Sequence, residues 1–202
     1  MIKKERLLNY KSHNDPFPVI EISNFLDQEE CIVATRILQN TKYDEFVRLN
    51  RSNIRKGSKT FKDLLNQNKV FNDIYKFFNN EEQYNFLVAE LEKVSKKSKN
   101  NFVMKNKPKL FKENIFKYKE SIHGKNLILK IFNLIKNKIL NKFFNYYYFD
   151  LHFSKAKKGY AMHTHRDNDT RFLTFLLYFN TLEFEDGGKF EIYKKNNEFG
   201  LD

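Results

Sequence analysis

The sequence is poor in cysteine and contains no long apolar run, and both absences narrow what the protein can be. Cys31 is the single cysteine in 202 residues, so no disulfide can form within the chain. The segment from Met1 to Arg6 is not followed by the apolar part of a secretory signal, and no apolar run approaches the roughly 18 residues of a membrane helix. Internal repeats and proline- or serine-rich linkers are also missing. We therefore expect a cytoplasmic protein with no membrane segment.

Positive charge predominates, but it is spread along the chain. The sequence has 37 lysines and arginines against 25 acidic residues, a net charge of +12. Only seven of the basic residues are arginines, and the lysines are scattered among Asn, Ile and Phe. This pattern is typical of a solvated surface, so we do not expect nucleic acid as a partner. A hydrophobic fraction of 41% is enough for one domain with a real core.

Helical patterns come first and β-rich patterns follow. Asp27 and Glu30 have capping-box spacing, which indicates the start of a helix. We expect a loose polar arm over residues 1–15, an edge strand over 17–22, a helix over 27–40 and an exposed basic loop over 48–59. Amphipathic helices should follow over 61–78 and 80–97, and then a surface excursion over 96–119. The last elements are an apolar-striped helix over 126–144 that packs on the following sheet, and β-rich runs over 146–153, 172–179 and 189–193.

This order indicates an α+β fold in which helices back a β-structure. We expect three regions, namely the arm over residues 1–15, a mainly helical support over 16–145, and a β-rich part over 146–202. The boundary near residue 146 follows from the change to aromatic and β-rich sequence. Residues 48–59 also carry several basic side chains that could lie beside an anionic substrate, but we favour a solvated connection for them.

One short stretch carries residues with metal-binding chemistry. His165 and Asp167 are two residues apart, so in an extended segment they point the same way with about 7 Å between their Cα atoms. An imidazole and a carboxylate can share one metal ion, and two His with one carboxylate leave three positions open on Fe(II). His163 lies on the same face and offers an alternative register. In it, His163 is itself a metal ligand or is a residue that hydrogen-bonds to a ligand. His152 could contribute from the preceding strand, or could be a hydrogen-bonded structural histidine.

The context of this pair resembles a known family. In order, the chain has Gly159-Tyr160, His165-Arg166-Asp167, Arg171, Tyr178-Phe179-Asn180, the acidic turn at 183–186 and Gly187-Gly188, and its entry over residues 16–26 also fits. These motifs cover about 60 residues. The pattern resembles the prolyl-4-hydroxylase-like branch of the 2-oxoglutarate- and Fe(II)-dependent dioxygenases.

The resemblance implies a double-stranded β-helix, a jelly roll of the cupin-like kind, over residues 146–202. It also implies that His165 and Asp167 bind iron and that Tyr178 donates a hydrogen bond to the distal carboxylate of 2-oxoglutarate. Arg171 would brace the ligand loop, or is a solvated residue at a strand start. The implied cofactors are Fe(II), 2-oxoglutarate as cosubstrate, and ascorbate. The reaction oxidatively decarboxylates 2-oxoglutarate with O₂ and hydroxylates a C–H bond, while the substrate, a protein side chain or a small metabolite, is not specified.

The chain departs from the family pattern after these motifs. Family members place a distal His and a basic residue for 2-oxoglutarate beyond the H-x-D pair, and here no His follows His165. We therefore expect a fragment or a truncated gene, with the last strands missing, that binds Fe(II) weakly and turns over little 2-oxoglutarate.

Two other functions fit the sequence. In a non-catalytic jelly-roll or cupin module, His163, His165 and Asp167 would form a polar loop, and His165→Ala would leave iron binding unchanged. In an oxygenase that acts on nucleic acid, binding to DNA or RNA would depend steeply on salt.

Overall fold

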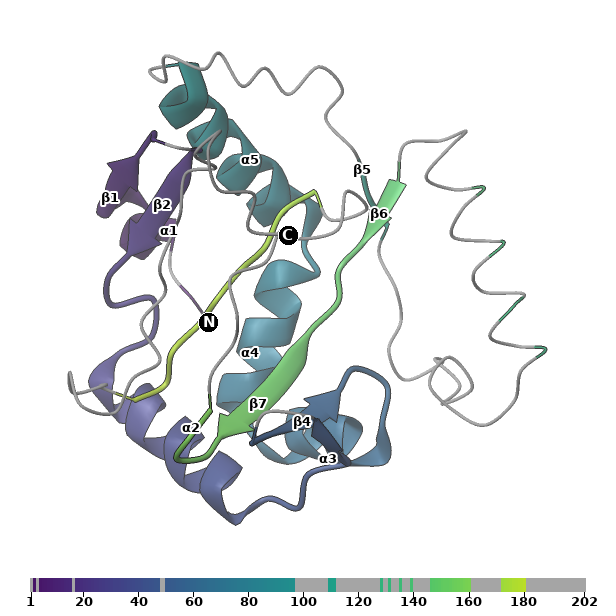
Figure 1. Cartoon of the computed structure of the whole chain (residues 1–202). Coiled ribbons are helices and arrows are strands. Elements are labelled where there is room, and N and C mark those ends of the chain that lie inside the picture. Colours follow the sequence, from purple (N-terminus) through teal and green to yellow (C-terminus); the bar gives the residue numbers. More distant parts are fainter. Residues whose placement is uncertain are drawn as a thin grey trace, which may run out of the picture.

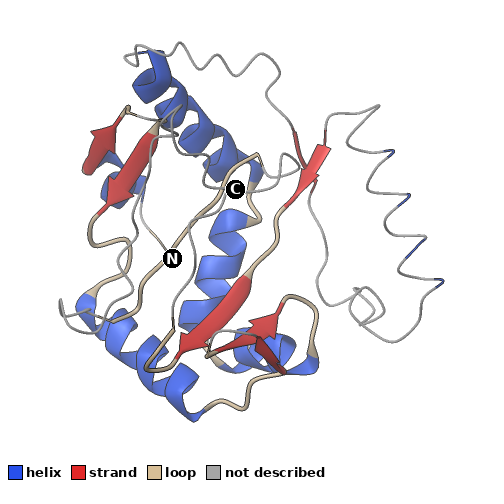
Figure 2. Cartoon of the chain, in the orientation of Figure 1, coloured by secondary structure: helices blue, strands red, loops and turns tan. Residues whose placement is uncertain are grey.

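The computed structural model describes residues 2, 4–15, 17–47, 50–96, 109–111, 128, 131, 135, 139, 146–160 and 172–180. Helices and strands are mixed, with the long helices grouped on one side of β7 (Figures 1 and 2). The elements are α1 (Lys4–Leu8), β1 (Tyr10–His13), β2 (Val19–Ile22), α2 (Gln28–Asn40), β3 (Glu45–Val47), β4 (Arg51–Arg55), α3 (Lys59–Gln67), α4 (Lys69–Phe78), α5 (Glu81–Lys96), β5 (Lys109–Phe111), β6 (Tyr146–Tyr148) and β7 (His152–Ala156).

The N-terminal residues are ordered, so the expectation of a loose arm over residues 1–15 was wrong. They contain α1 and β1, and β1 pairs antiparallel with β2. Ile2 and Leu7 are 7% and 1% exposed and pack with Phe25 and Leu26. Two apolar side chains in a polar segment therefore anchor it, because burying each one stabilises the contact by about 1.5–3 kcal/mol. The strand expected over residues 17–22 is confirmed at β2.

The helix expected over residues 27–40 is confirmed as α2, and its first turn closes as a capping box. The Asp27 carboxylate accepts a hydrogen bond from the Glu30 amide at 2.8 Å, and the Asp27 amide donates to Glu30 Oε2 at 3.0 Å. Arg6 of α1 also lies 3.3 Å from Glu30 Oε2. The same two acidic residues therefore begin α2 and hold α1 beside it.

The basic segment over residues 48–59 contains a central strand, so the expectation of an exposed loop was wrong. β4 lies between β3 and β7 in an antiparallel sheet. Asn53 and Ile54 are 5% and 0% exposed, and the Ser154 hydroxyl donates to Asn53 Oδ1 at 2.7 Å. A single buried isoleucine among charged residues is a weak periodic signal, and the strand forms because β7 supplies its hydrogen bonds.

The helical support has one more helix than its periodicity predicted. The expected helix over residues 61–78 is divided into α3 and α4, because Asn68 has an extended backbone (φ −133°, ψ 115°). The helix over residues 80–97 is confirmed as α5. α4 packs against α2, α3 and α5, so the aromatic side chains of α4 lie at the centre of the helical group.

The chain after α5 follows the sequence expectations in part. The excursion over residues 96–119 includes β5, which pairs parallel with β6 and buries Leu110. Residues 128, 131, 135 and 139, within the helix expected over 126–144, are helical. Their isoleucine side chains are 46–78% exposed, and the packing of this helix on a sheet stays a prediction. The β-rich run over residues 146–153 is confirmed by β6 and β7, whereas the run over 189–193 lies outside the described residues.

Residues 172–180 were expected to form a strand over 172–179 and carry neither helix nor strand. They run across the helical group (Figure 1), with the Phe175 ring 4.7 Å from that of Phe78. Leu177 and Phe179 pack inward and Tyr178 is 49% exposed, so side chains alternate over residues 176–180 as in a strand. The contacts of these apolar side chains with the helices hold the segment in place.

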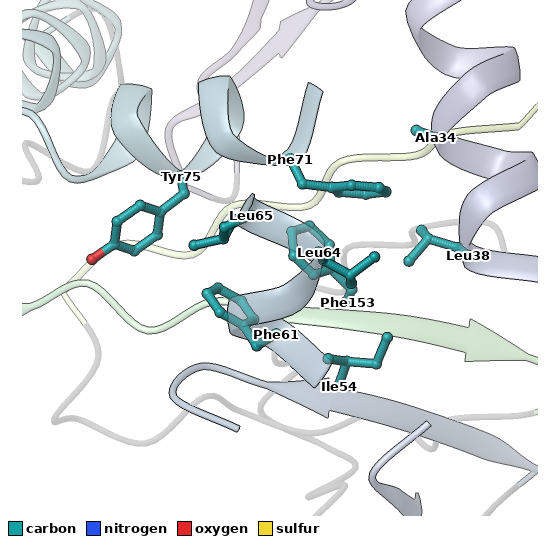
Figure 3. Packing of buried hydrophobic residues seen from close by; sticks show 9 residues of the cluster. All are labelled: Ala34, Leu38, Ile54, Phe61, Leu64, Leu65, Phe71, Tyr75 and Phe153. Carbon is teal, nitrogen blue, oxygen red and sulfur yellow. The ribbon is translucent and has the colours of Figure 1, made fainter. Parts of the chain in front are cut away.

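The main core lies between β4, β7 and the helices (Figure 3). The Phe153 ring from β7 packs against Phe61 of α3 at 5.4 Å and against Phe71 of α4 at 4.9 Å. Its buried members are Ala34, Leu38, Ile54, Phe61, Leu64, Leu65, Phe71, Tyr75 and Phe153. This core joins residues far apart in sequence and fixes β7 against the helices.

The described strands form sheets of two, three and two strands. This mixture agrees with a chain that combines helix and strand, but the described strands by themselves do not make a double-stranded β-helix. The jelly roll over residues 146–202 stays a prediction, as does the division of the rest of the chain into a mainly helical support over 16–145 and a β-rich part over 146–202.

A buried carboxylate links the N-terminal strand to α5 and makes stability depend on pH. Glu90 is 7% exposed and accepts hydrogen bonds from Lys93 and from the Tyr10 hydroxyl, the latter at 2.7 Å. These bonds lower the pKa of Glu90 below its usual 4.5. A carboxyl group with a lowered pKa in the folded state contributes stability above its unfolded pKa, and this stability is lost as pH falls through the folded value.

We expect Glu90→Gln to flatten the loss of stability with acid. The wild-type chain should lose unfolding free energy as pH falls below about 4.5, and the variant should lose less over the same range because one titrating contact is gone. Urea denaturation at several pH values measures this, with Glu29→Gln at the exposed start of α2 as the control. Equal pH slopes in wild type and Glu90→Gln would contradict the expectation.

Candidate functional site

Two turns lie against each other at the end of β7, and together they fix the position of the chain that leaves this strand. Asn50, in the turn between β3 and β4, has φ +57°, a conformation that asparagine tolerates well. Its carbonyl accepts a hydrogen bond from the Lys157 amide at 2.9 Å, and its side-chain amide donates to the Lys158 carbonyl at 3.3 Å. The turn after β7 is thereby fixed on the turn before β4.

Gly159 is required in the second of these turns. Its φ is +82°, and a Cβ atom there would lie 3.2 Å from Asn50 Nδ2. A side chain would therefore be strained both by the backbone conformation and by the closeness of the asparagine. The Tyr160 amide then closes the turn by donating to the Lys157 carbonyl at 3.0 Å.

This geometry brings an arginine over the ring of Tyr160. Arg51 is the first residue of β4 and pairs with Ala156, the last residue of β7. Its Cζ atom lies 6.0 Å from the centre of the Tyr160 ring, within the range of a cation–π contact. Arg51 Nε is buried, and it is one of two buried side-chain atoms in the described part of the chain that have no hydrogen-bond partner.

Tyr178 belongs to the segment over residues 172–180 and is 49% exposed. Partial burial raises the pKa of Tyr178, and the charge of Tyr160 raises this pKa further because two phenolates would repel each other. The backbone on either side is held in place, since the Thr35 hydroxyl donates to the Phe179 carbonyl at 2.9 Å and the Phe179 ring packs 6.1 Å from that of Phe71. We refer to Arg51, Tyr160 and Tyr178 together as the Arg51 corner.

Of the candidate site residues, the structure describes Tyr178 and His152, and of the surrounding motifs it describes Gly159-Tyr160 and Phe179-Asn180. The predicted iron ligands His165 and Asp167, the alternative His163, and Arg171, Gly187 and Gly188 lie outside the described residues. The segment with H-x-D starts directly after Tyr160 and is followed by the segment with Tyr178. His165 is five residues from Tyr160, so chain connectivity limits their Cα separation to about 17 Å.

His152 lies at the opposite end of the sheet from the Arg51 corner. It pairs with Arg55 in the β4–β7 register, four residues from the Arg51–Ala156 pair, which corresponds to about 13 Å. Its Nε2 atom lies 3.2 Å from Asp150 Oδ2, and the imidazole is 37% exposed. The interpretation as a hydrogen-bonded structural histidine therefore fits the structure better than a ligand role.

No group of three His, Cys, Asp or Glu side chains that could hold a metal ion is present among the residues that the structure describes. His165 and Asp167 carry an imidazole and a carboxylate, which are donor groups that non-haem Fe(II) sites use. Their role as iron ligands stays a prediction.

Arg51 is the residue that the sequence did not indicate. It was placed in a solvated loop, because the basic residues around it showed no clean period. Asn50 could have indicated the strand, because asparagine favours tight turns and lies here between two short segments that include the apolar residues Val47 and Ile54. A hairpin centred on Asn50 would have put Arg51 at the start of a strand.

Comparison with models of known protein families, with curated proteins and with solved structures gave no match for this chain. Within the described ranges, none of the helices combines the length and the apolar character needed to cross a membrane.

Proposed function

We propose that the chain is part of an Fe(II)- and 2-oxoglutarate-dependent dioxygenase that resembles the prolyl-4-hydroxylases. The single observation that carries this proposal is the order of motifs in the sequence, in which Gly159-Tyr160 leads into His165-x-Asp167 and Tyr178 follows. This order of a possible metal-binding pair and a phenol able to donate a hydrogen bond to a keto acid is the one that the family resemblance calls for.

The chain's own residues support particular roles. His165 and Asp167 are the residues that would hold the iron, through one imidazole nitrogen and one carboxylate. The raised pKa of Tyr178 keeps its hydroxyl protonated at neutral pH, so it remains a hydrogen-bond donor to a carboxylate. When bound, Fe(II) with 2-oxoglutarate and O₂ supplies the oxidation, and ascorbate would keep the metal reduced.

Anaerobic titration with Fe(II), with and without 2-oxoglutarate, tests this function. A metal-to-ligand charge-transfer band should appear when both are present. We expect His165→Ala and Asp167→Ala each to weaken Fe(II) binding by at least about 100-fold and to abolish the band, because removing a ligand costs more than removing a residue that only orients one. His163→Ala should keep the band if His165 is the ligand.

His152→Ala is the matched control, since it removes an imidazole at the far end of the β4–β7 pair and should leave the band unchanged. The proposal is overturned if the wild-type chain shows no band, or if the band survives in both ligand variants. Isothermal calorimetry of Fe(II) binding gives the affinities without any need for turnover.

A further inference from the structure

We propose that the Arg51 corner binds a carboxylate group. Arg51, Tyr160 and Tyr178 come from three separate segments, and the β4–β7 register together with the Asn50–Gly159 turn brings the first two into contact. Nothing in the family resemblance assigns a role to Arg51 or to Tyr160. The inference rests on the proposed function, because it places this carboxylate beside the start of the H-x-D segment.

The guanidinium is prepared for an anion. Its Nε atom is buried and has no hydrogen-bond partner, which is costly for a donor, and a carboxylate that displaces the groups covering this atom would satisfy it. The guanidinium Cζ atom lies 6.0 Å from the centre of the Tyr160 ring, and this cation–π contact restricts a side chain that would otherwise lose much rotational freedom on binding. A planar, preorganised arginine is the side chain best suited to a two-point contact with a carboxylate.

The surroundings add positive charge and a neutral donor. Lys157 and Lys158 occupy the exposed turn that leads to Tyr160, and the Tyr178 hydroxyl interacts electrostatically with Tyr160, which raises the pKa of Tyr178. Partial burial lowers the local dielectric constant and strengthens each contact with an anion. A carboxylate here would contact one cation and at least one phenol, and would be drawn in by the two lysines.

Two sources of the carboxylate are consistent with this chemistry. One is the distal carboxylate of 2-oxoglutarate, and the other is an acidic group on the substrate. The first arm of the test compares 2-oxoglutarate with 2-oxobutyrate, a keto acid that has no distal carboxylate, using the charge-transfer band of the Fe(II)-loaded chain. The second arm measures binding of a fluorescein-labelled decaglutamate peptide to the chain loaded with Fe(II) and 2-oxoglutarate.

We expect Arg51→Gln to weaken binding of the carboxylate ligand by about 10- to 100-fold, the effect of losing a hydrogen bond to a charged group. Loss of 2-oxoglutarate affinity with unchanged 2-oxobutyrate affinity would identify the cosubstrate as the source. Loss of peptide binding alone would identify an acidic substrate. Arg51→Lys should recover part of the affinity, because it restores the charge without the planar contact.

Arg55→Gln is the matched control, because it removes an arginine from the other end of β4 and should leave both affinities unchanged. Tyr178→Phe keeps the ring and removes only the hydroxyl, so it tests the corner even if Arg51→Gln fails to fold, and should weaken carboxylate binding by about 3- to 10-fold. Circular dichroism confirms folding of each variant.

The outcomes separate the two proposals. If the wild-type chain forms the charge-transfer band but Arg51→Gln and Tyr178→Phe bind 2-oxoglutarate and the peptide as tightly as wild type, the Arg51 corner is overturned and the oxygenase proposal stands. If the wild-type chain forms no band, the oxygenase proposal fails and the inference that rests on it fails with it.

Discussion

Replacing Phe71 by alanine is expected to lower the free energy of unfolding by about 3–5 kcal/mol. The Phe71 side chain is 0% exposed, and its ring packs 4.9 Å from that of Phe153 and 6.1 Å from that of Phe179. Truncation removes a large apolar side chain and leaves a cavity between α4, β7 and the segment over residues 172–180. Urea denaturation followed by circular dichroism measures the change.

The Phe71 substitution has a matched control in Phe17→Ala. Phe17 is 46% exposed, so the same chemical change should alter the unfolding free energy by about 0.5 kcal/mol or less. A typical domain is stable by only about 5–15 kcal/mol, and Phe71→Ala should therefore populate unfolded chains under mild conditions. Equal effects of the two substitutions would show that α4 is not at the centre of the core.

Leu7→Ala should cost about 2–5 kcal/mol, although the residue lies in a segment that its polar sequence suggested to be loose. Leu7 is 1% exposed and belongs to the cluster that includes Phe25, Ile74 and Leu87. The substitution should lower the midpoint of urea denaturation and should also increase amide exchange in β1, because α1 and β1 are joined directly.

Leu8→Ala is the control for Leu7, since it removes the same atoms one residue later from a side chain that is 62% exposed. We expect no more than about 0.5 kcal/mol from it. If Leu7→Ala is as mild as Leu8→Ala, the N-terminal helix does not contribute to the fold, and the packing of α1 on the helices is wrong.

Sequence reasoning was most accurate where the decisive interactions are local. The Asp27–Glu30 capping box begins α2 with donors and acceptors three residues apart, so the pattern contains all of the physics that it needs. α5 was found in the same way, through apolar residues such as Leu87 and Leu91 that recur along one helical face. Boundaries set by one backbone conformation, such as the break at Asn68, were not visible in the apolar pattern.

Sequence reasoning failed where the partners are distant. β4 was read as a loop because the hydrogen bonds that make it a strand come from β7, and the pattern around Ile54 alone is weak. The candidate site divides in the same way. Tyr178 was named from its motif, whereas Arg51 was missed because only the β4–β7 register brings it to the ring of Tyr160. The roles of His165, Asp167 and Arg171 stay predictions.

The pairing of β4 with β7 also has a consequence for how the chain reaches its native state. Asn53 and Ser154 are 101 residues apart, and closing a loop of that length costs about 4 kcal/mol of chain entropy before any contact offsets it. At about 5–20 residues per second, the ribosome delivers β7 roughly 5–20 s after β4. During that interval α3 and α4 present Phe61 and Phe71 without their β7 partner Phe153. Newly made chains should therefore bind chaperones that recognise exposed aromatic surface until β7 emerges.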